Sequence, residues 1–348
     1  MNFKSVKLSD YTTIKLGGIS NKFIECVNEK DILSAVAYAH EKRIPFQVLG
    51  RGSNTIFSDN GFNGVVIYIN SKGIEKSGDI FSVKAGECWD GFVEHTLNLN
   101  YSGIECLSGI PGSTGATPIQ NVGAYGHEVS NVIETVKVID VHTLNIVKFN
   151  NNECDFSYRN SRFKSIDKNK YIITEVIFKL YPSGEPEIRY KELSDYLGTY
   201  HGFNSLNNIK DKLLIVRDAV LTIRKKKSMV YDKNDKDSHS CGSFFTNPVL
   251  NSYEFDSFVL ICKNLDLAVN SYKSGEYYKI SAAWLIENSG FSKGYTENGF
   301  GLSNKHTLAI VNRGGSTIDL MNFSEKITKT VYNKFKISLE REPELVLG

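Results

Sequence analysis

The 348-residue sequence lacks the features that mark membrane, secreted and nucleic-acid-binding proteins. No run of apolar residues approaches the length of a membrane span. The first ten residues lack the apolar core of a secretory signal. Lys plus Arg (41) exceed Asp plus Glu (39) by only two, so no global charge attracts nucleic acid or an anionic membrane. We therefore expect a cytoplasmic protein that binds neither nucleic acid nor a membrane.

Cysteine is scarce and scattered. The six cysteines include no C-x-x-C pair, which argues against a zinc site and against a disulfide framework. Reduced thiols of a cytosolic protein fit this pattern better, and we expect no metal. The contents of 41% hydrophobic and 23% charged residues are those of a globular chain, and the length suggests about two to three domains.

Residues 108–126 form a glycine-rich loop without a charged side chain, S-G-I-P-G-S-T-G-A-T-P-I-Q-N-V-G-A-Y-G. Five of the 28 glycines and two of the seven prolines lie here, and they interrupt both the helical and the strand period. Glycine lets main-chain N–H groups approach an anion or a planar ring closely. A passive linker is the alternative, but Ile110, Ile119 and Tyr125 favour a structured ligand loop.

Gly50-Arg51-Gly52-Ser53-Asn54 follows a predicted strand and offers N–H, hydroxyl and amide donors to a phosphate. It is neither the Walker phosphate loop, because no Lys follows the second glycine, nor the three-glycine dinucleotide fingerprint. By itself an ordinary β-turn explains it equally well.

The apolar periodicity predicts a β-α-β start and a mixed fold. We expect helices at 29–43, 89–98, 211–224, 253–264 and 280–286, and a last helix capped by Ser324. Predicted strands lie at 23–27, 46–49, 64–69, 80–85, 132–140, 146–149, 172–180 and 307–312, and residues 228–240 are predicted to form a polar surface loop or domain junction.

Three further segments contain chemically useful groups. Arg159, within Y-R-N-S-R at 158–162, could hold a carboxylate or phosphate, although a surface Arg in a turn is the simpler interpretation. Ser243, within C-G-S-F-F-T-N-P at 241–248, lacks the G-x-S-x-G nucleophile context, which leaves the role of a proton donor in a dry site. The basic run 224–227 suits either a solvated helix end or a diphosphate.

Taken in order, these segments resemble the UDP-N-acetylenolpyruvoylglucosamine reductases, flavoenzymes of bacterial cell-wall synthesis. The resemblance runs through T-T-I-K-L-G-G (12–18), L-G-R-G-S-N (49–54), the glycine-rich loop, F-S-Y-R-N-S-R-F-K (156–164), G-S-F-F-T-N-P (242–248), A-A-W-L-I-E (282–287) and L-E-R-E-P-E (339–344). Each motif is unspecific alone, but the ordered set is very specific.

The resemblance implies an α+β fold, with a vanillyl-alcohol-oxidase-like FAD-binding fold of two subdomains and a C-terminal α/β substrate-binding domain. The implied boundaries are 1–70 and 71–222 for the FAD subdomains, 223–322 for the substrate domain, and 323–348 for a helix and tail that return to the flavin region. The implied cofactors are non-covalent FAD and NADPH as hydride donor, and we expect a monomer.

The residues implied to hold FAD belong to the two glycine-containing segments. They are Gly50, Arg51, Gly52, Ser53, Asn54, Thr55, Ile110, Ser113, Thr114, Gly115, Thr117, Ile119, Gln120, Asn121, Gly123, Ala124, Tyr125 and Gly126.

The family's catalytic positions match Arg159, Ser243 and Glu342, with Glu340 and Glu344 as alternatives to the last. Those matching substrate contacts are Tyr158, Tyr190, Arg224, Lys227, Asn247 and Lys293. Tyr190 lies in E-P-E-I-R-Y-K-E-L (185–193), which resembles the substrate-closing loop of the longer family type. The run R-K-K-K-S-M (224–229) departs from the family's R-T-T-K-L-P and leaves open which lysine meets the diphosphate.

The implied reaction is reduction of the enolpyruvyl ether of a UDP-sugar by NADPH through FAD, in the synthesis of a peptidoglycan precursor. Flavin N5 gives hydride to C3, Arg159 and Glu342 stabilise or polarise the enolate-like group, and Ser243 protonates C2. Two alternatives stay open: an FAD oxidase of the same fold, and a flavin- or nucleotide-sugar-binding module without catalysis.

Overall fold

The computed structural model describes residues 2–200 and 202–348, which fold into two compact units. The first unit consists of Met1–Val6, Ile19–Gly52 and Phe62–Val230, and the second of Lys7–Gly18, Ser53–Gly61 and Tyr231–Gly348. Both are discontinuous in sequence. The subdomain boundaries expected above remain predictions.

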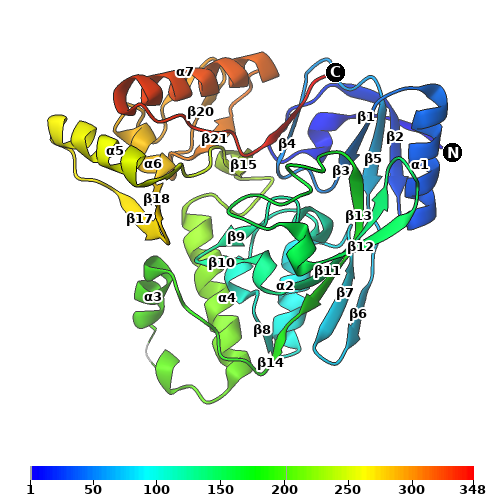
Figure 1. Cartoon of the computed structure of the whole chain (residues 1–348), viewed down its shortest axis with the longest axis horizontal. Coiled ribbons are helices and arrows are strands. Elements are labelled where there is room, and N and C mark those ends of the chain that lie inside the picture. The colour runs from blue at the N-terminus through cyan, green and yellow to red at the C-terminus, as the bar shows by residue number, and fades with distance from the viewer. Residues whose placement is uncertain (1, 201) are drawn as a thin grey trace. The chain divides into compact units, whose positions relative to one another are not determined.

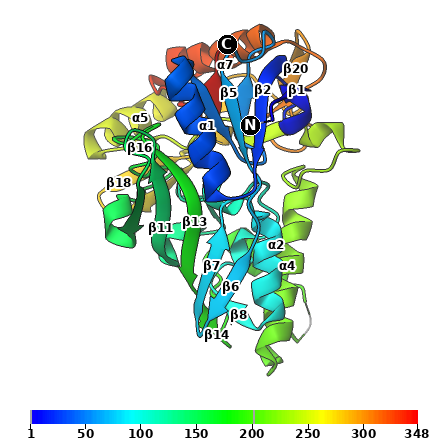
Figure 2. The same ribbon diagram turned by 90° about the vertical axis from the view of Figure 1, so that its right-hand side faces the viewer.

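The first unit begins with a four-stranded sheet in the order β1-β2-β5-β3. Its strands are β1 (Lys4–Lys7), β2 (Ile19–Cys26), β3 (Phe46–Leu49) and β5 (Val65–Ile69). β5 runs parallel to both β2 and β3. Helix α1 (Glu29–Lys42) connects β2 to β3 and packs against β2 and β5 (Figure 2), with Asn28 as its N-cap. The predicted β-α-β start is confirmed, with β5 inserted between its two strands.

An antiparallel sheet of five strands follows, in the order β12-β11-β13-β7-β6. Its strands are β6 (Ile74–Ser77), β7 (Ile80–Lys84), β11 (Ile133–Asp140), β12 (Ile146–Asn150) and β13 (Tyr171–Lys179). Helices α2 (Trp89–Asn98) and α4 (Ile209–Lys226) lie side by side in both ribbon views, and α3 (Lys191–Gly198) contacts α4 (Figure 1). Two short strand pairs, β8 (Tyr101–Ser102) with β14 (Tyr181–Pro182) and β9 (Gly123–Ala124) with β10 (His127–Glu128), complete the unit.

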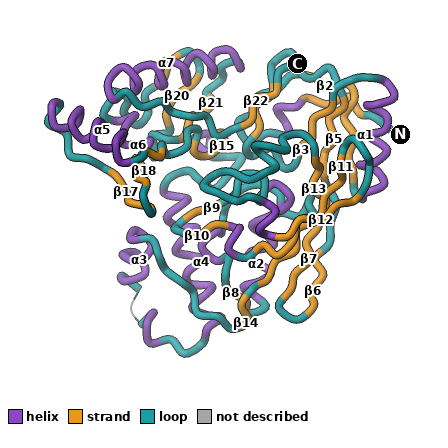
Figure 3. Tube along the Cα trace, in the orientation of Figure 1, coloured by secondary structure: helices purple, strands orange, loops and turns teal. Residues whose placement is uncertain are grey.

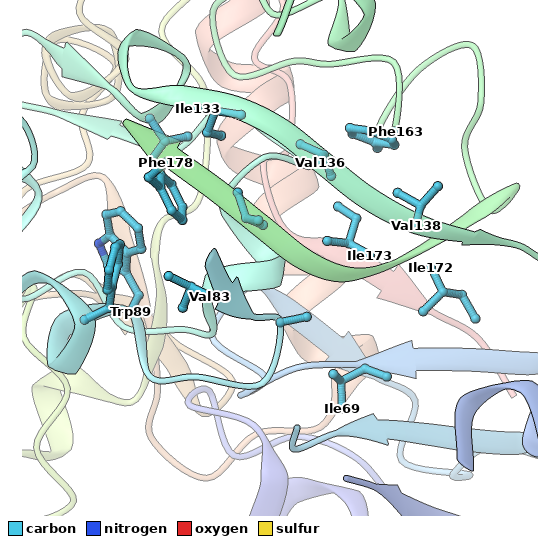
Figure 4. Packing of buried hydrophobic residues seen from close by; sticks show 14 of the residues in the cluster. Ile69, Val83, Trp89, Ile133, Val136, Val138, Phe163, Ile172, Ile173 and Phe178 are labelled. Carbon is cyan, nitrogen blue, oxygen red and sulfur yellow. The ribbon is translucent and has the colours of Figure 1, made fainter. Parts of the chain in front are cut away.

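The core of this unit lies on the five-stranded sheet. Figure 4 shows Val136 and Val138 of β11 beside Ile173 of β13, and Trp89 near Phe178. The rings of Trp89 and Phe178 are 6.0 Å apart, and both side chains are fully buried. Burial of such side chains stabilises the sheet and the elements packed on it.

The second unit contains an antiparallel sheet in the order β15-β21-β20-β19 and another in the order β16-β18-β17. Its strands are β4 (Thr55–Phe57), β15 (Ser240–Ser243), β16 (Val249–Leu250), β17 (Ser271–Ser274), β18 (Tyr277–Ile280), β19 (Thr296–Glu297), β20 (Phe300–Leu302), β21 (Ala309–Asn312) and β22 (Glu344–Val346). Its helices are α5 (Ser252–Asn264), α6 (Ala282–Glu287) and α7 (Thr317–Phe335). α7 packs against β20 and α6 (Figure 3). β22 pairs in parallel with β4, which comes from a distant part of the sequence.

Two predictions of local structure are wrong. The last helix begins at Thr317 with Ser316 as its N-cap, so Ser324 lies inside α7 and is buried. Ile280 belongs to β18, and Ser281 caps α6. The segment 228–240, predicted to be a surface loop or a domain junction, contains the boundary between the two units at Val230 and Tyr231, and Asp237 and Ser238 within it are buried. The wrong cap overlooked a local signal, because Ser316 and Asp319 form a capping box at the start of α7.

Candidate functional site

The first half of the glycine-rich loop is anchored by its own main chain. The N–H of Thr114 donates to the carbonyl of Glu87 (2.9 Å), and that of Gly115 to the carbonyl of Ala85 (2.9 Å). Both donors belong to a 3₁₀ helix, Thr114–Ala116. A Cβ on Gly115 would lie 2.5 Å from the Cβ of Ala85, so only glycine permits this approach. The prediction of a structured loop rather than a passive linker is therefore correct.

The turn at Gly50–Gly52 approaches the same loop. A Cβ on Gly50 would lie 2.3 Å from Ser113 Oγ, and Gly52 is buried with φ +64°. The hydroxyl of Thr114 is also buried, and the part of the chain that the structure describes offers it no hydrogen-bond partner. A glycine cradle beside an unsatisfied hydroxyl fits a group rich in oxygen acceptors, such as the diphosphate of FAD.

Arg159 occupies a tight turn in which Ser157 and Asn160 exchange both main-chain hydrogen bonds at 3.1 Å. Its φ of +53° is unusual for a residue other than glycine and is of the kind that clusters at functional sites. Its Nη2 donates to the carbonyl of Gly123 at 2.7 Å, and its guanidinium lies 5.4 Å from the ring of Tyr158. The structure thus brings Arg159 and Tyr158 together with the second half of the glycine-rich loop.

Two more hydrogen bonds connect this turn to the loop. Ser161 Oγ donates to the carbonyl of Ile119 at 2.6 Å, and Asn121 Nδ2 donates to the carbonyl of Ser157 at 3.1 Å. Asn121 Nδ2 also donates to Glu128 Oε2 (2.7 Å), while its Oδ1 accepts the N–H of Ser130 (3.1 Å). The amide of Asn121 therefore holds the loop's shape, and its expected contact with the cofactor stays a prediction.

Tyr190, the expected substrate-closing residue, lies at the start of α3 and is exposed. Its ring makes an edge contact with Tyr125 of the glycine-rich loop, with centroids 5.6 Å apart. Burial raises the pKa of Tyr125 to about 12, so its hydroxyl stays protonated at neutral pH. Arg189 forms a two-point ion pair with Glu187 at 2.6 Å, and His127 Nε2 donates to the carbonyl of Glu187 at 2.8 Å.

The basic run occupies the last turn of α4. Burial lowers the pKa of the Arg224 guanidinium, and its Nε has no hydrogen-bond partner among the described residues. Lys226 lies over the ring of Tyr196 at 5.3 Å, and Lys225 is exposed. Lys227 is half-buried and forms an ion pair of 2.6 Å with Glu192.

Asp90 and Arg217 were missed by the sequence analysis. Arg217 of α4 donates to both carboxylate oxygens of Asp90, at 2.6 and 2.9 Å, and the N–H of Gly109 donates to the same carboxylate at 2.6 Å. This carboxylate thus fixes the first glycine of the loop. No sequence signal reveals the contact, because the three residues are far apart along the chain.

Ser243 and Glu342 lie on neighbouring extended segments of the second unit. Ser243 ends β15 opposite Ala309 of β21, directly after Gly242 with φ +71°. The N–H of Glu342 donates to the carbonyl of Phe244 at 2.9 Å. Phe245 forms an isolated antiparallel β-bridge with Arg341. Glu342 is half-buried, whereas Glu340 and Glu344 are exposed.

The same segment meets the residues that follow the Gly50–Gly52 turn. The carbonyl of Asn54 accepts the N–H of Glu344 at 2.9 Å, and Asn54 Nδ2 donates to the carbonyl of Glu342 at 3.4 Å. Burial and the nearby charge of Glu342 together raise the pKa of the Cys241 thiol, which favours its neutral form. All six cysteines are free thiols.

The two expected substrate residues of the second unit have different surroundings. Asn247 Oδ1 accepts the N–H of Ala282 at the start of α6 (2.9 Å), whereas Lys293 is exposed in a loop. That loop is held by Gly294, whose N–H donates to the carbonyl of Ser303 at 3.2 Å. Asp237 accepts hydrogen bonds from Ser303 and Arg313, a buried role that the sequence did not predict.

Among the described residues, no helix combines the length and the apolarity that a membrane span requires.

Comparisons with known proteins agree with this picture. The family model described as "UDP-N-acetylenolpyruvoylglucosamine reductase, C-terminal domain" matches residues 233–346, and the model described as "FAD binding domain" matches residues 21–148. The α+β FAD-binding fold with a C-terminal domain, expected from the sequence, is thereby confirmed.

Relatives and a solved structure extend the match over the whole length. The UDP-N-acetylenolpyruvoylglucosamine reductase of Streptomyces coelicolor is 38% identical over 97% of this chain and 88% of its own. That of Thermobifida fusca is 40% identical over 99% of this chain and 97% of its own. The crystal structure of the reductase from Thermus caldophilus shares the fold, with a TM-score of 0.69 at 23% identity over 99% of both chains. The chain belongs to the UDP-N-acetylenolpyruvoylglucosamine reductase family and is a flavin-type oxidoreductase.

Proposed function

We propose that the protein reduces UDP-N-acetylglucosamine enolpyruvate to UDP-N-acetylmuramate with NADPH, through FAD, in the synthesis of a peptidoglycan precursor. The observation that carries the proposal is the pairing of Ser243 and Glu342, a hydroxyl and a half-buried carboxyl held on adjacent backbone segments. NADPH as donor rests on family membership. The cytoplasmic location, the monomeric state and the domain boundaries expected above stay predictions.

The residues of the glycine cradle fit FAD because they lie next to the unsatisfied hydroxyl of Thr114. Gly50, Gly52 and Ser113 would let the diphosphate approach the main chain, and the hydroxyl of Thr114 would gain an acceptor. Residues 119–126 would face the ring. When bound, FAD supplies the hydride chemistry between NADPH and the enolpyruvyl ether.

Arg159 would stabilise the negative charge that develops on the substrate carboxylate. Its hydrogen bond to the Gly123 carbonyl and its contact with Tyr158 hold the guanidinium before substrate arrives. Because this cation is already in place, little free energy is needed to reorganise the site when the reaction occurs. The guanidinium is always charged and presents its donors as a planar fork, so it suits a carboxylate better than a lysine ammonium does.

Ser243 Oγ would give a proton to C2 of the substrate, and Glu342 would orient or polarise the same group. Glu342 is the better of the three glutamates because its backbone is bonded to Phe244, next to Ser243, whereas Glu340 and Glu344 are exposed. A serine hydroxyl is a weak acid, so the transfer requires a very basic carbanion and close placement. Tyr190, Arg224, Lys227, Asn247 and Lys293 would bind the UDP-sugar.

The test is the visible absorption spectrum of the purified protein under anaerobic conditions. Anaerobic NADPH should bleach the flavin bands, and the enolpyruvyl sugar should restore them. A protein that lacks the flavin spectrum and does not regain it with added FAD contradicts the proposal. Fast reoxidation by air without the sugar would support an FAD oxidase instead.

A further inference from the structure

The ion pair between Glu192 and Lys227 connects α3 to the basic end of α4. Lys227 Nζ lies 2.6 Å from Glu192 Oε2, and the two side chains are 35% and 41% exposed. Such a partly exposed pair is weak enough to be exchanged for another partner.

Glu192 stands only two residues after Tyr190, in the first turn of α3. Tyr190 is the residue that immediately precedes this helix, so the carboxylate and the phenol ring are carried by one rigid element. At the same time the Tyr190 ring contacts Tyr125 of the glycine-rich loop. The start of α3 is therefore held on one side by an ion pair and on the other by an aromatic contact.

The three lysines of the basic run differ in what they touch. Lys225 is exposed, and Lys226 lies over the Tyr196 ring at 5.3 Å. Among the described residues, Lys227 is the one lysine of this run whose ammonium group lies within ion-pair distance of a carboxylate on α3. A diphosphate that binds Lys227 competes with this carboxylate, because two anions at one ammonium group repel each other.

We propose that Glu192 is a positioning residue that holds Lys227 in the ligand-free protein and competes there with the substrate's diphosphate. Exchange of the carboxylate for the diphosphate removes one of the two contacts that hold the start of α3. This inference rests on the proposed function, which assigns the diphosphate to Lys227.

The test is calorimetric titration of UDP into the FAD-loaded protein at low salt. E192Q should bind UDP about two- to fivefold more tightly, the size expected when a partly exposed competing pair is removed. K227M should bind more weakly, and the double variant should bind like K227M, because the effect of Glu192 acts through Lys227. D195N, which breaks the neighbouring exposed pair with Lys191, is the matched control and should bind like the wild type.

Steady-state kinetics give a second readout. E192Q should lower KM for the enolpyruvyl sugar by the same factor, and the difference should shrink at high salt because exposed charges are screened. The inference is overturned if E192Q binds UDP like the wild type or more weakly, or if its tighter binding persists in the K227M background. If the wild type itself fails to bind UDP, the proposed function fails and the role of Glu192 fails with it.

Discussion

The glycine-rich loop and the Ser243–Glu342 pair place their functional groups by opposite means. The loop uses contiguous residues, glycine and main-chain hydrogen bonds, and contains no charged side chain. The pair joins residues from separate segments through strand-like backbone contacts. The loop thereby presents main-chain groups, whereas the pair brings a hydroxyl and a carboxyl onto adjacent backbone segments.

The difference predicts which substitutions affect chemistry and which affect cofactor binding. Changes at the pair should leave the flavin in place and slow a chemical step. Changes around the loop should weaken FAD binding or destabilise the fold, and should affect the rate of a chemical step less.

The largest effect is expected for S243A. Reoxidation of the reduced flavin by the enolpyruvyl sugar should slow by about 10²–10⁴-fold, because the proton donor is lost. Reduction by NADPH should remain close to wild type, since it needs no proton from Ser243. Stopped-flow absorbance measures both half-reactions separately. If both stay at wild-type rates, Ser243 is not the donor.

E342Q should slow the same half-reaction by about 10²–10³-fold, the usual cost of losing one preorganised group. Its backbone hydrogen bond to Phe244 is kept, so the segment should fold normally. E340Q is the matched control, because Glu340 is exposed and two residues away. A rate loss in E340Q as large as that in E342Q would show that the acidic tail, and not one carboxyl, matters.

G50A should weaken FAD binding by about tenfold, a difference of 1.4 kcal/mol. The new methyl group would stand 2.3 Å from Ser113 Oγ, so either this hydroxyl must rotate away from its place in the cradle or the turn and the loop must separate. Fluorescence titration of the apoprotein with FAD measures the affinity. G198A is the control, since a Cβ at Gly198 meets nothing within 4 Å. Equal affinities in the two variants would refute the close approach.

D90N should lower the free energy of unfolding by about 1 to 3 kcal/mol at neutral pH. Burial raises the pKa of Asp90, but hydrogen bonds from Arg217 and the Gly109 N–H outweigh it and hold the pKa below its ordinary value. A carboxyl whose pKa falls on folding stabilises the protein above its unfolded pKa, and this contribution is lost as the pH falls through the folded pKa.

Thermal melts of the wild type and D90N should therefore differ most near neutral pH and converge in acid, below about pH 4. D195N, at an exposed pair, should melt like the wild type throughout. A D90N deficit that stays constant down to acid pH would mean that the ionised carboxylate is not the stabilising form.

The sequence predicted most of what lies in contiguous motifs. The loop's structured character, the β-α-β start and the family are correct because glycine, proline and apolar spacing act locally. The catalytic and cofactor residues stay predictions, although Ser243 and Glu342 lie on adjacent segments.

Contacts between distant residues could not be predicted from a single sequence. Asp90, Glu192 and Asp237 look like ordinary surface acids in the sequence, and only the fold supplies Arg217, Lys227 and Arg313 as their partners. The wrong cap at Ser324 has a different origin, because Ser316 forms a capping box with Asp319, a local signal that the sequence analysis overlooked.

The parallel pairing of β22 with β4 has a consequence for the order of synthesis. A ribosome makes β4 long before β22, so the strand that carries Thr55–Phe57 waits for its partner through most of translation. Glu342, two residues before the start of β22, is therefore synthesised after the other segments that it contacts. The nascent chain makes the glycine-rich loop and Ser243 well before the pairing of β22 with β4 can form.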